Sequence, residues 1–210
     1  MRKCFFPVWV IVALLLLPLW AEAAGPILIE GAMKCETDLL IEKLDNPKEQ
    51  RIGGWRFVSG DIKGIPVVVS VTSIGMTNAA AATALGIEYF RPAAVINQGT
   101  SGGHDPALHT YDIVLGASTF DSGSWISRQE RRGADGRHIK LFPSYFYDSV
   151  RKEDKEEIEL TADPELLEAA MAEAGNYQAG RVVSGKIATS NNWNRQMARI
   201  RFLQEVRLIL

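Results

Sequence analysis

The chain has 210 residues, of which 23 are Lys or Arg and 25 are Asp or Glu, so its formal net charge is −2. This balance lacks the basic excess of a nucleic-acid-binding surface, and we expect no nucleic-acid partner. Two cysteines are too few for a disulfide framework. The length fits a single domain with a sizeable core.

The first 24 residues have the pattern of a secretory signal peptide. Arg2 and Lys3 precede an apolar run over residues 8–19, and Ala21-Glu22-Ala23 supplies a small-x-small cleavage site. The run is short for a stable membrane span, although an uncleaved anchor is the alternative. We therefore expect a secreted or periplasmic protein without a membrane span, whose domain covers residues 25–210.

Removal of this segment would change the charge and the thiol content. Loss of Arg2, Lys3 and Glu22 leaves 21 basic and 24 acidic residues, a net charge of −3. Cys4 would leave as well, so Cys35 would have no intramolecular partner. We interpret Cys35 as a small core-facing residue and not as a nucleophile, since the sequence shows no His partner for it.

Beyond residue 25 the pattern alternates between strands and helices. The periodicity predicts strands at 26–29, 55–61, 65–71, 94–97, 113–118 and 180–184, and helices at 36–44, 78–89 and 164–174. The strands at 55–61 and 65–71 are expected to form a hairpin. The β-branched 65–71 strand, an alanine-rich helix capped by Asn78, and the 94–97 strand read as a βαβ unit. These elements predict an α/β fold with a mixed central sheet covered by helices.

Residues 121–159 differ in character from the rest of the chain. Dense mixed charge over 128–137 and 151–159 flanks an aromatic stretch at 142–147. We interpret this segment as a surface excursion whose charges form a solvated face. The three histidines are not spaced as metal ligands and no C-x-x-C or H-E-x-x-H motif occurs, so we expect no metal and no cofactor.

Two short segments carry the candidate chemistry. Gly31-Ala32-Met33-Lys34-Cys35-Glu36 joins an apolar strand to a helix and puts a carboxylate in the first helical turn, where unpaired N–H groups face a ligand. The loop Gln98-Gly99-Thr100-Ser101-Gly102-Gly103 follows a buried-looking strand and combines small residues with hydroxyls. The first segment alone is also consistent with an ordinary helix start bearing a solvated Glu36.

Taken with three further segments, these motifs resemble the 5′-methylthioadenosine/S-adenosylhomocysteine nucleosidases of the nucleoside phosphorylase superfamily. The further segments are residues 72–81, Asp112-Ile113-Val114 and Val183-Ser184-Gly185, and all five motifs stand in the family's order over residues 26–205. The resemblance implies a three-layer α/β/α fold with a mixed central sheet, nucleoside phosphorylase-like and incomplete at the C-terminus. It also implies a purine nucleoside as the small-molecule partner and a homodimer for the complete protein.

The resemblance also implies roles for single residues. Glu36 matches the carboxylate that activates water, and Met33 is expected beside the substrate. Thr100, Ser101 and Gly102 would contact the ribose or the nucleophilic water. Substrate-binding roles at the purine follow for two further residues: the backbone of Thr189 would contact the purine edge, and Trp193 would stack on the base, with a core position as the alternative for Trp193.

Other parts of the family pattern do not occur in these 210 residues. The Met-Glu pair that grips the ribose and the Ser-Asp pair that protonates the purine would fall beyond residue 206, so we expect little nucleosidase activity from this chain alone. Three functions therefore stay open. They are an N-glycosyl hydrolase acting on methylthioadenosine-like nucleosides, a purine nucleoside phosphorylase, and a non-catalytic module that binds purine nucleosides. Glu36 in place of phosphate ligands favours the hydrolase.

Overall fold

The computed structural model describes residues 25–133, 138–192 and 197–205. The predicted signal peptide and Trp193 therefore lie outside the described residues. In the part of the chain that is described, no helix is long and apolar enough to cross a membrane. The contacts divide the chain into two compact units. The first runs to Thr72 and includes Ala82–Gln98; the second holds Ser73–Ala81 and the chain from Gly99 onward.

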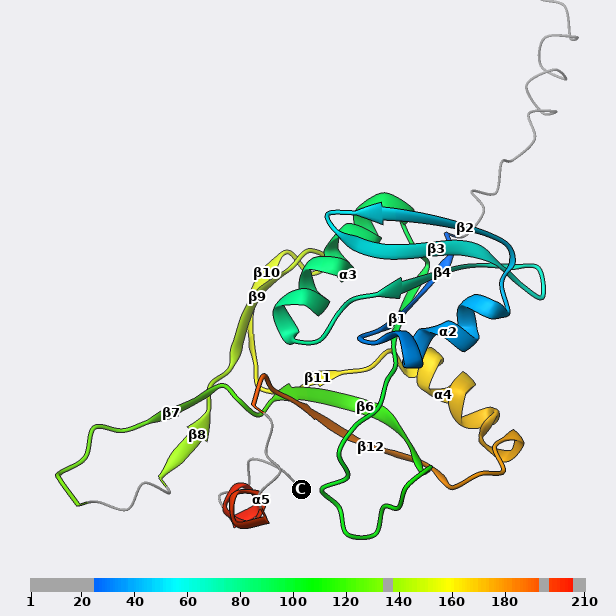
Figure 1. Cartoon of the computed structure of the whole chain (residues 1–210). Coiled ribbons are helices and arrows are strands. Elements are labelled where there is room, and N and C mark those ends of the chain that lie inside the picture. The colour runs from blue at the N-terminus through cyan, green and yellow to red at the C-terminus, as the bar shows by residue number, and fades with distance from the viewer. Residues whose placement is uncertain (1–24, 134–137, 193–196, 206–210) are drawn as a thin grey trace, which may run out of the picture. The chain divides into compact units, whose positions relative to one another are not determined.

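The first unit contains a five-stranded mixed sheet in the order β2-β3-β4-β1-β5 (Figure 1). β1 pairs in parallel with both β4 and β5, whereas β2, β3 and β4 follow one another as antiparallel neighbours. The elements, in chain order, are β1 (Ile27–Gly31), α2 (Lys34–Glu42), β2 (Asp45–Ile52), β3 (Trp55–Ile62), β4 (Ile65–Val71), α3 (Met76–Phe90), of which the part from Ala82 belongs to this unit, and β5 (Ala94–Asn97).

Both faces of this sheet are covered, because successive strand residues point to opposite sides. Leu28 of β1 joins a cluster with Phe57 and Val68, against which Leu85 and Phe90 of α3 pack. The neighbouring Ile29 packs instead in a cluster with Val67 and Val69 that includes Leu40 and Ile41 of α2. The first unit is thus a three-layer α/β/α arrangement, as the sequence predicted.

Close packing of α3 depends on a glycine. A methyl group built on Gly86 would lie 2.7 Å from Leu28 Cδ2 and 3.3 Å from Phe57 Cε1. Only a residue without a side chain lets the helix approach the sheet this closely.

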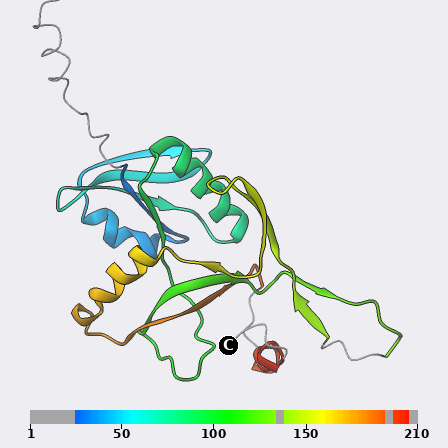
Figure 2. The same cartoon turned by 180° about the vertical axis from the view of Figure 1, so that it is seen from behind.

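The second unit is built on β6, which pairs in parallel with β12 and antiparallel with the short β11 (Figures 1 and 2). Two separate hairpins, β7–β8 and β9–β10, lie between β6 and β11 in the chain. The elements are β6 (Ile113–Asp121), β7 (Trp125–Ser127), β8 (Ile139–Leu141), β9 (Ser144–Asp148), β10 (Glu153–Glu157), β11 (Leu160–Thr161), α4 (Pro164–Ala172), a 3₁₀ turn (Ala174–Asn176), β12 (Val182–Thr189) and α5 (Met197–Glu205).

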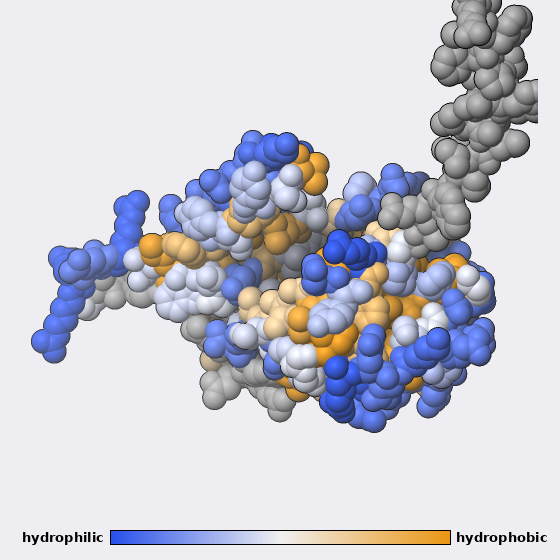
Figure 3. Space-filling view, turned by 90° about the horizontal axis from the view of Figure 1, so that it is seen from above, coloured by the Kyte–Doolittle hydropathy of each residue, from blue (hydrophilic) through white to orange (hydrophobic). Residues whose placement is uncertain are grey.

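The charged excursion predicted for residues 121–159 contains these two hairpins. All described residues from 128 to 133 are exposed, and on the face shown in Figure 3 hydrophilic residues run along the end of the β7–β8 hairpin. The aromatic stretch is also largely exposed, with Tyr145 at 63% and Tyr147 at 60%. Its one recorded ring contact joins Phe142 and Tyr145, whose centroids lie 5.9 Å apart.

Three local expectations need correction. β2 was not predicted, because its sequence DNPKEQRI is polar; it is an edge strand with only Ile52 buried, and its register shifts between Asp45 and Lys48, where Pro47 can be accommodated. β12 runs five residues past the predicted end because a bulge after Gly185 restores its pairing with β6. Asn78 does not cap α3, which begins two residues earlier at Met76.

The start of α3 is satisfied by a residue far along the chain. Asn191 Oδ1 accepts a hydrogen bond from the Met76 N–H at 3.0 Å, which is the bond a capping side chain would accept. Asn78, inside the first turn, donates instead to the Ile74 carbonyl at 2.8 Å. The capping partner is separated by 115 residues, so local sequence spacing could not identify it.

One carboxylate lies inside the first unit. Glu30 of β1 is 2% exposed, its Oε2 accepts a 2.8 Å hydrogen bond from Thr83 Oγ1 of α3, and its Oε1 has no hydrogen-bond partner among the described residues. Burial raises the pKa of Glu30 above its ordinary value, while hydrogen bonds from Thr83 and Asn97 oppose the shift. A raised pKa in the folded state means that Glu30 stabilises the fold most when it is protonated.

We predict that the free energy of unfolding of Glu30→Gln rises relative to that of the parent as pH increases. The unfolded chain releases the Glu30 proton at the lower pH, so the parent loses stability relative to Glu30→Gln as pH rises through the folded-state pKa. Urea unfolding at a series of pH values from about 2 to 8 measures this difference. An unchanged difference across the series would contradict the prediction.

Glu49 supplies a control of opposite sign for this experiment. The hydrogen bond from Arg56, 2.9 Å long, lowers the pKa of Glu49 below its ordinary value. The parent should therefore lose its advantage over Glu49→Gln as pH falls through the folded-state pKa of Glu49. The stability of the parent relative to the variant should therefore fall with rising pH for Glu30→Gln and with falling pH for Glu49→Gln.

Candidate active site

Three parallel strands of the first unit end at one edge of the sheet, and the residues that follow them meet there. The Gln98 N–H, after β5, donates to the Glu30 carbonyl of β1 at 2.9 Å. The Thr72 N–H, after β4, donates to the Gly31 carbonyl at 2.9 Å. Ligands of parallel sheets bind outside the carboxyl ends of strands, so this edge is the place to examine.

The candidate base Glu36 stands in the first turn of α2, five residues after the end of the buried part of β1. Its N–H donates to the Met33 carbonyl at 3.0 Å, and its Oε2 accepts from the Met33 N–H at 3.0 Å. Met33 stands at the N-cap without a side-chain cap hydrogen bond, and the Glu36 side chain supplies the carboxylate half of a capping box. The structure therefore brings together the two site residues predicted from the first motif, and it fixes one carboxylate oxygen of Glu36.

The residues around Glu36 divide between buried and exposed positions. Thr37 is fully buried and donates through Oγ1 to the Met33 carbonyl at 3.2 Å. Cys35 lies on the outside of the helix, so the expectation that it faces the core is wrong. In a helix the residue two positions from a buried one points away from it, and Thr37 takes the inward direction here.

The glutamine that follows β5 also reaches this turn. Gln98 Nε2 donates to the main-chain carbonyl of Glu36 at 2.7 Å. A methyl group on Gly31 would lie 2.8 Å from Thr37 Cγ2 and 3.0 Å from Gln98 Nε2. Gly31 thus leaves the space that lets Thr37 and Gln98 pack against the strand-to-helix turn. Sequence reasoning considered only the glycines and hydroxyls of the Gln98–Gly103 loop and missed Gln98.

We predict that Gly31→Ala lowers the free energy of unfolding by about 1–3 kcal/mol, because the added methyl overlaps two packed side chains. Urea unfolding of the parent and the variant measures the difference. Gly175→Ala is the matched control, because an added methyl there would meet no atom within 4 Å and the backbone is not left-handed. Equal effects of the two substitutions would contradict the packing described for Gly31.

The other predicted site residues belong to the second unit. Thr100, Ser101 and Gly102 are exposed in an irregular loop, where Ser101 Oγ donates to the Gly102 carbonyl at 3.4 Å. Thr189 is the last residue of β12, and its carbonyl accepts bonds from the N–H and hydroxyl of Ser122 at 2.9 and 3.1 Å. Trp193 lies outside the described residues. The substrate-binding roles of these residues remain predictions.

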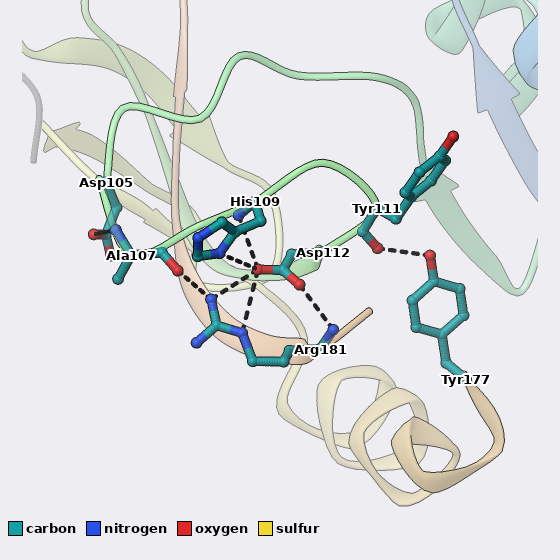
Figure 4. Close-up of polar contacts among 7 residues, drawn as sticks. All are labelled: Asp105, Ala107, His109, Tyr111, Asp112, Tyr177 and Arg181. Carbon is teal, nitrogen blue, oxygen red and sulfur yellow. Dashed lines mark hydrogen bonds and ion pairs between the residues drawn. The ribbon is translucent and has the colours of Figure 1, made fainter. Parts of the chain in front are cut away.

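An ion pair closes the long loop that begins at Thr100 (Figure 4). Arg181, just before β12, donates to Asp112 Oδ2 through Nη2 at 2.7 Å and through its backbone N–H to Asp112 Oδ1 at 2.8 Å. Arg181 Nη2 also bonds the Ala107 carbonyl within the loop. The Tyr177 hydroxyl donates to the Tyr111 carbonyl at 2.6 Å. The C-terminal part of the loop is thereby tied to the segment that leads into β12.

Asp112 is held as an anion in this arrangement. Its side chain is only 7% exposed. The hydrogen bonds from the Arg181 side chain, then those from the backbone of Arg181 and His109, lower the pKa of Asp112 far below its usual range. The sequence analysis noted Asp112 as part of a motif, but its partner Arg181 is 69 residues away and was not identified.

We predict that Asp112→Asn lowers the unfolding temperature and speeds proteolytic cleavage within residues 99–111. The folded-state pKa lies below the unfolded value, so the parent keeps this stabilisation above about pH 4, the ordinary range of an aspartate, and loses it as pH falls through the lower folded-state pKa. Limited proteolysis with mass spectrometry locates the cuts. Asp105→Asn is the control, since an amide oxygen can still accept the bond that the Asp105 side chain accepts from the Ala107 N–H.

Comparisons with known proteins place this fold. The chain matches the phosphorylase superfamily over residues 26–209. It is 30% identical over 178 residues to a 5′-methylthioadenosine/S-adenosylhomocysteine nucleosidase of Anoxybacillus flavithermus, covering 85% of this chain and 69% of that protein. It is 42% identical over 87 residues to the protein of the same description from Halalkalibacterium halodurans, covering 41% and 38% of the two chains.

Solved structures agree with the sequence comparison. The nucleosidase of Neisseria meningitidis in complex with methylthio-immucillin-A matches with a TM-score of 0.69 and 25% identity, over 87% of this chain and 71% of that one. The nucleosidase of Colwellia psychrerythraea in complex with adenine matches with a TM-score of 0.69 at 24% identity, over 87% and 69% of the two chains.

The fold and the sequence match define a member of the phosphorylase superfamily with a mixed α/β architecture. Within that superfamily, the chain belongs to the 5′-methylthioadenosine/S-adenosylhomocysteine nucleosidase family.

Proposed function

We propose that this protein hydrolyses the N-glycosidic bond of purine nucleosides that resemble 5′-methylthioadenosine or S-adenosylhomocysteine. The observation that carries the proposal is the position of Glu36. Its carboxylate stands in the first turn of a helix that follows the central parallel strand, and the Met33 N–H fixes one of its oxygens. The relatives of known structure hold adenine or methylthio-immucillin-A, which supports a purine nucleoside as substrate.

In the proposed reaction, water attacks C1′ of the sugar and the bond between C1′ and the purine nitrogen breaks. The carboxylate of Glu36 takes a proton from the water and later releases it to solvent, and the departing purine takes up a proton from solvent, so the products are the free sugar and the neutral base. The transition state has positive charge on the sugar, which a nearby carboxylate stabilises. Thr100, Ser101 and Gly102 would contact the ribose or the water, and Met33, Thr189 and Trp193 the remainder of the substrate.

The nucleophile distinguishes this proposal from phosphorolysis. Little adenine release from methylthioadenosine is expected of these 210 residues alone, and whatever release occurs should proceed without phosphate. A strict requirement for phosphate would identify a phosphorylase instead. Binding of methylthioadenosine without release of adenine, measured by calorimetry, would identify a non-catalytic binding module. Neither binding nor release would overturn the proposal altogether.

In a chain that also carries the family's Met-Glu and Ser-Asp pairs, we predict that Glu36→Gln lowers the hydrolysis rate by roughly a hundredfold or more while nucleoside binding stays within about tenfold. The amide keeps the size of the side chain and its acceptor for the Met33 N–H, but it cannot take a proton. Adenine release and calorimetric binding are measured on the same preparations, relative to the parent.

Asp38→Asn is the matched control for this substitution. Asp38 stands two residues further along α2 and forms exposed ion pairs with Lys34 at 3.9 Å and Arg56 at 3.7 Å, so the same change of a carboxylate to an amide occurs on the same helix. Its rate should stay within about twofold of the parent. If Glu36→Gln hydrolysed at the parent rate, Glu36 would not be the base.

We propose separately that residues 1–24 direct export. The support is the sequence alone: the basic start, the apolar run and the small residues at the cleavage site. N-terminal sequencing of protein recovered from an expressing cell should begin near Ala24 or Gly25. Recovery of a soluble product that retains Met1 would contradict export by this signal.

A further inference from the structure

Gln98 links two elements of the first unit that the chain itself does not join. Its backbone N–H continues the pairing of β5 with β1 through the Glu30 carbonyl, at 2.9 Å. Its side-chain amide then crosses to α2 and donates to the main-chain carbonyl of Glu36, at 2.7 Å. The backbone of Gln98 is therefore hydrogen-bonded to the sheet, and its side chain is hydrogen-bonded to the helix.

The contact falls on the residue that carries the candidate base. A carbonyl inside a helix uses one lone pair for the N–H four residues further on, and its second lone pair can accept another donor. Gln98 occupies this second position on Glu36. Gly31 makes the approach possible, because a side chain there would meet the Gln98 amide at 3.0 Å. The amide is thus packed in place as well as hydrogen-bonded.

Glu36 is consequently held at two points. Gln98 holds its main chain, and the Met33 N–H holds its carboxylate at 3.0 Å. The capping box alone fixes the carboxylate relative to α2, but it does not fix α2 relative to the sheet edge. The bond from Gln98 does so at the residue itself.

We propose that Gln98 is a positioning residue, which sets the place of the Glu36 carboxylate at the sheet edge by holding the Glu36 carbonyl. This inference rests on the proposed function where it concerns catalysis. Gln98 itself takes no proton and need touch no substrate. A small displacement of a catalytic group is costly, since a misplacement of about 1 Å can lower a rate by about a hundredfold.

The first test needs no catalytic activity. Gln98→Met keeps the length of the side chain and removes the donor. Amide hydrogen exchange, followed by nuclear magnetic resonance in the full chain, should become about fivefold faster at Met33 and Glu36, as expected for the loss of one hydrogen bond. The Leu44 amide, which donates to the Ile41 carbonyl at 3.2 Å after the end of α2, should keep its rate.

A matched control uses the same substitution at a similar bond elsewhere. Gln178 Nε2 donates to the Gly175 carbonyl at 2.8 Å in the second unit. Gln178→Met removes an equivalent amide-to-carbonyl bond and should leave exchange at Met33 and Glu36 unchanged. Unchanged exchange at Met33 and Glu36 in Gln98→Met as well would overturn the proposal.

The second test separates positioning from general stability through a double-mutant cycle. Gln98→Met should lower kcat by about tenfold and leave KM within about twofold, whereas Gln178→Met should change neither. In a Glu36→Gln background, adding Gln98→Met should lower the residual rate by less than twofold, because its effect passes through the lost carboxylate. An equal tenfold loss in both backgrounds would show that Gln98 acts independently of Glu36.

A third variant restores the donor under defined conditions. In Gln98→Glu an ionised carboxylate would repel the Glu36 carbonyl, whereas the protonated form can donate to it. The rate relative to the parent at the same pH should therefore rise as pH falls. A flat ratio would contradict the proposed bond. If the parent releases no adenine at all, the proposed function fails, while the exchange measurement still decides whether Gln98 holds the turn.

Discussion

The arrangement of the first unit depends on β1 being paired on both sides. Its residues are matched with β4 and β5 in parallel register, Ile27 opposite Val67 and Ala94, and the alternation of Leu28 and Ile29 fills the cores on the two faces. A shift of one residue would turn each apolar side chain to the other face. This register fixes where β1 ends, and the end of β1 determines where α2 and its Glu36 begin.

Glu36 shows how one side chain can serve the fold and the chemistry proposed for it. As a capping-box residue it satisfies a helix N–H that would otherwise be unpaired. The same bond restricts its rotation, so a carboxylate that is structurally useful is also held in one place. The sequence allowed two interpretations of Glu36, an ordinary helix start or a catalytic carboxylate. The structure is compatible with both at once.

The two units contain carboxylates in contrasting environments, Asp112 in the second unit and Glu30 in the first. Asp112 is nearly buried but surrounded by donors from Arg181 and His109, which keep it charged. Glu30 is buried with fewer donors, and its pKa is raised. A buried carboxylate oxygen without a hydrogen-bond partner lowers the stability of the fold, and the fold tolerates this cost. The paired Asp112, in contrast, holds the end of the loop that begins at Thr100.

The sequence by itself determined the elements whose periodicity is strong: the hairpin of β3 and β4, the β4-α3-β5 unit and the order of the family motifs. It also identified Glu36, because a carboxylate in a helix start after a buried strand is visible in local spacing. Tertiary structure alone decided which distant groups complete these elements. Gln98 on Glu36, Asn191 on Met76 and Arg181 on Asp112 join residues 62, 115 and 69 positions apart. Polar side chains carry no periodic signal for such partners, because the choice depends on which strand ends the fold brings together.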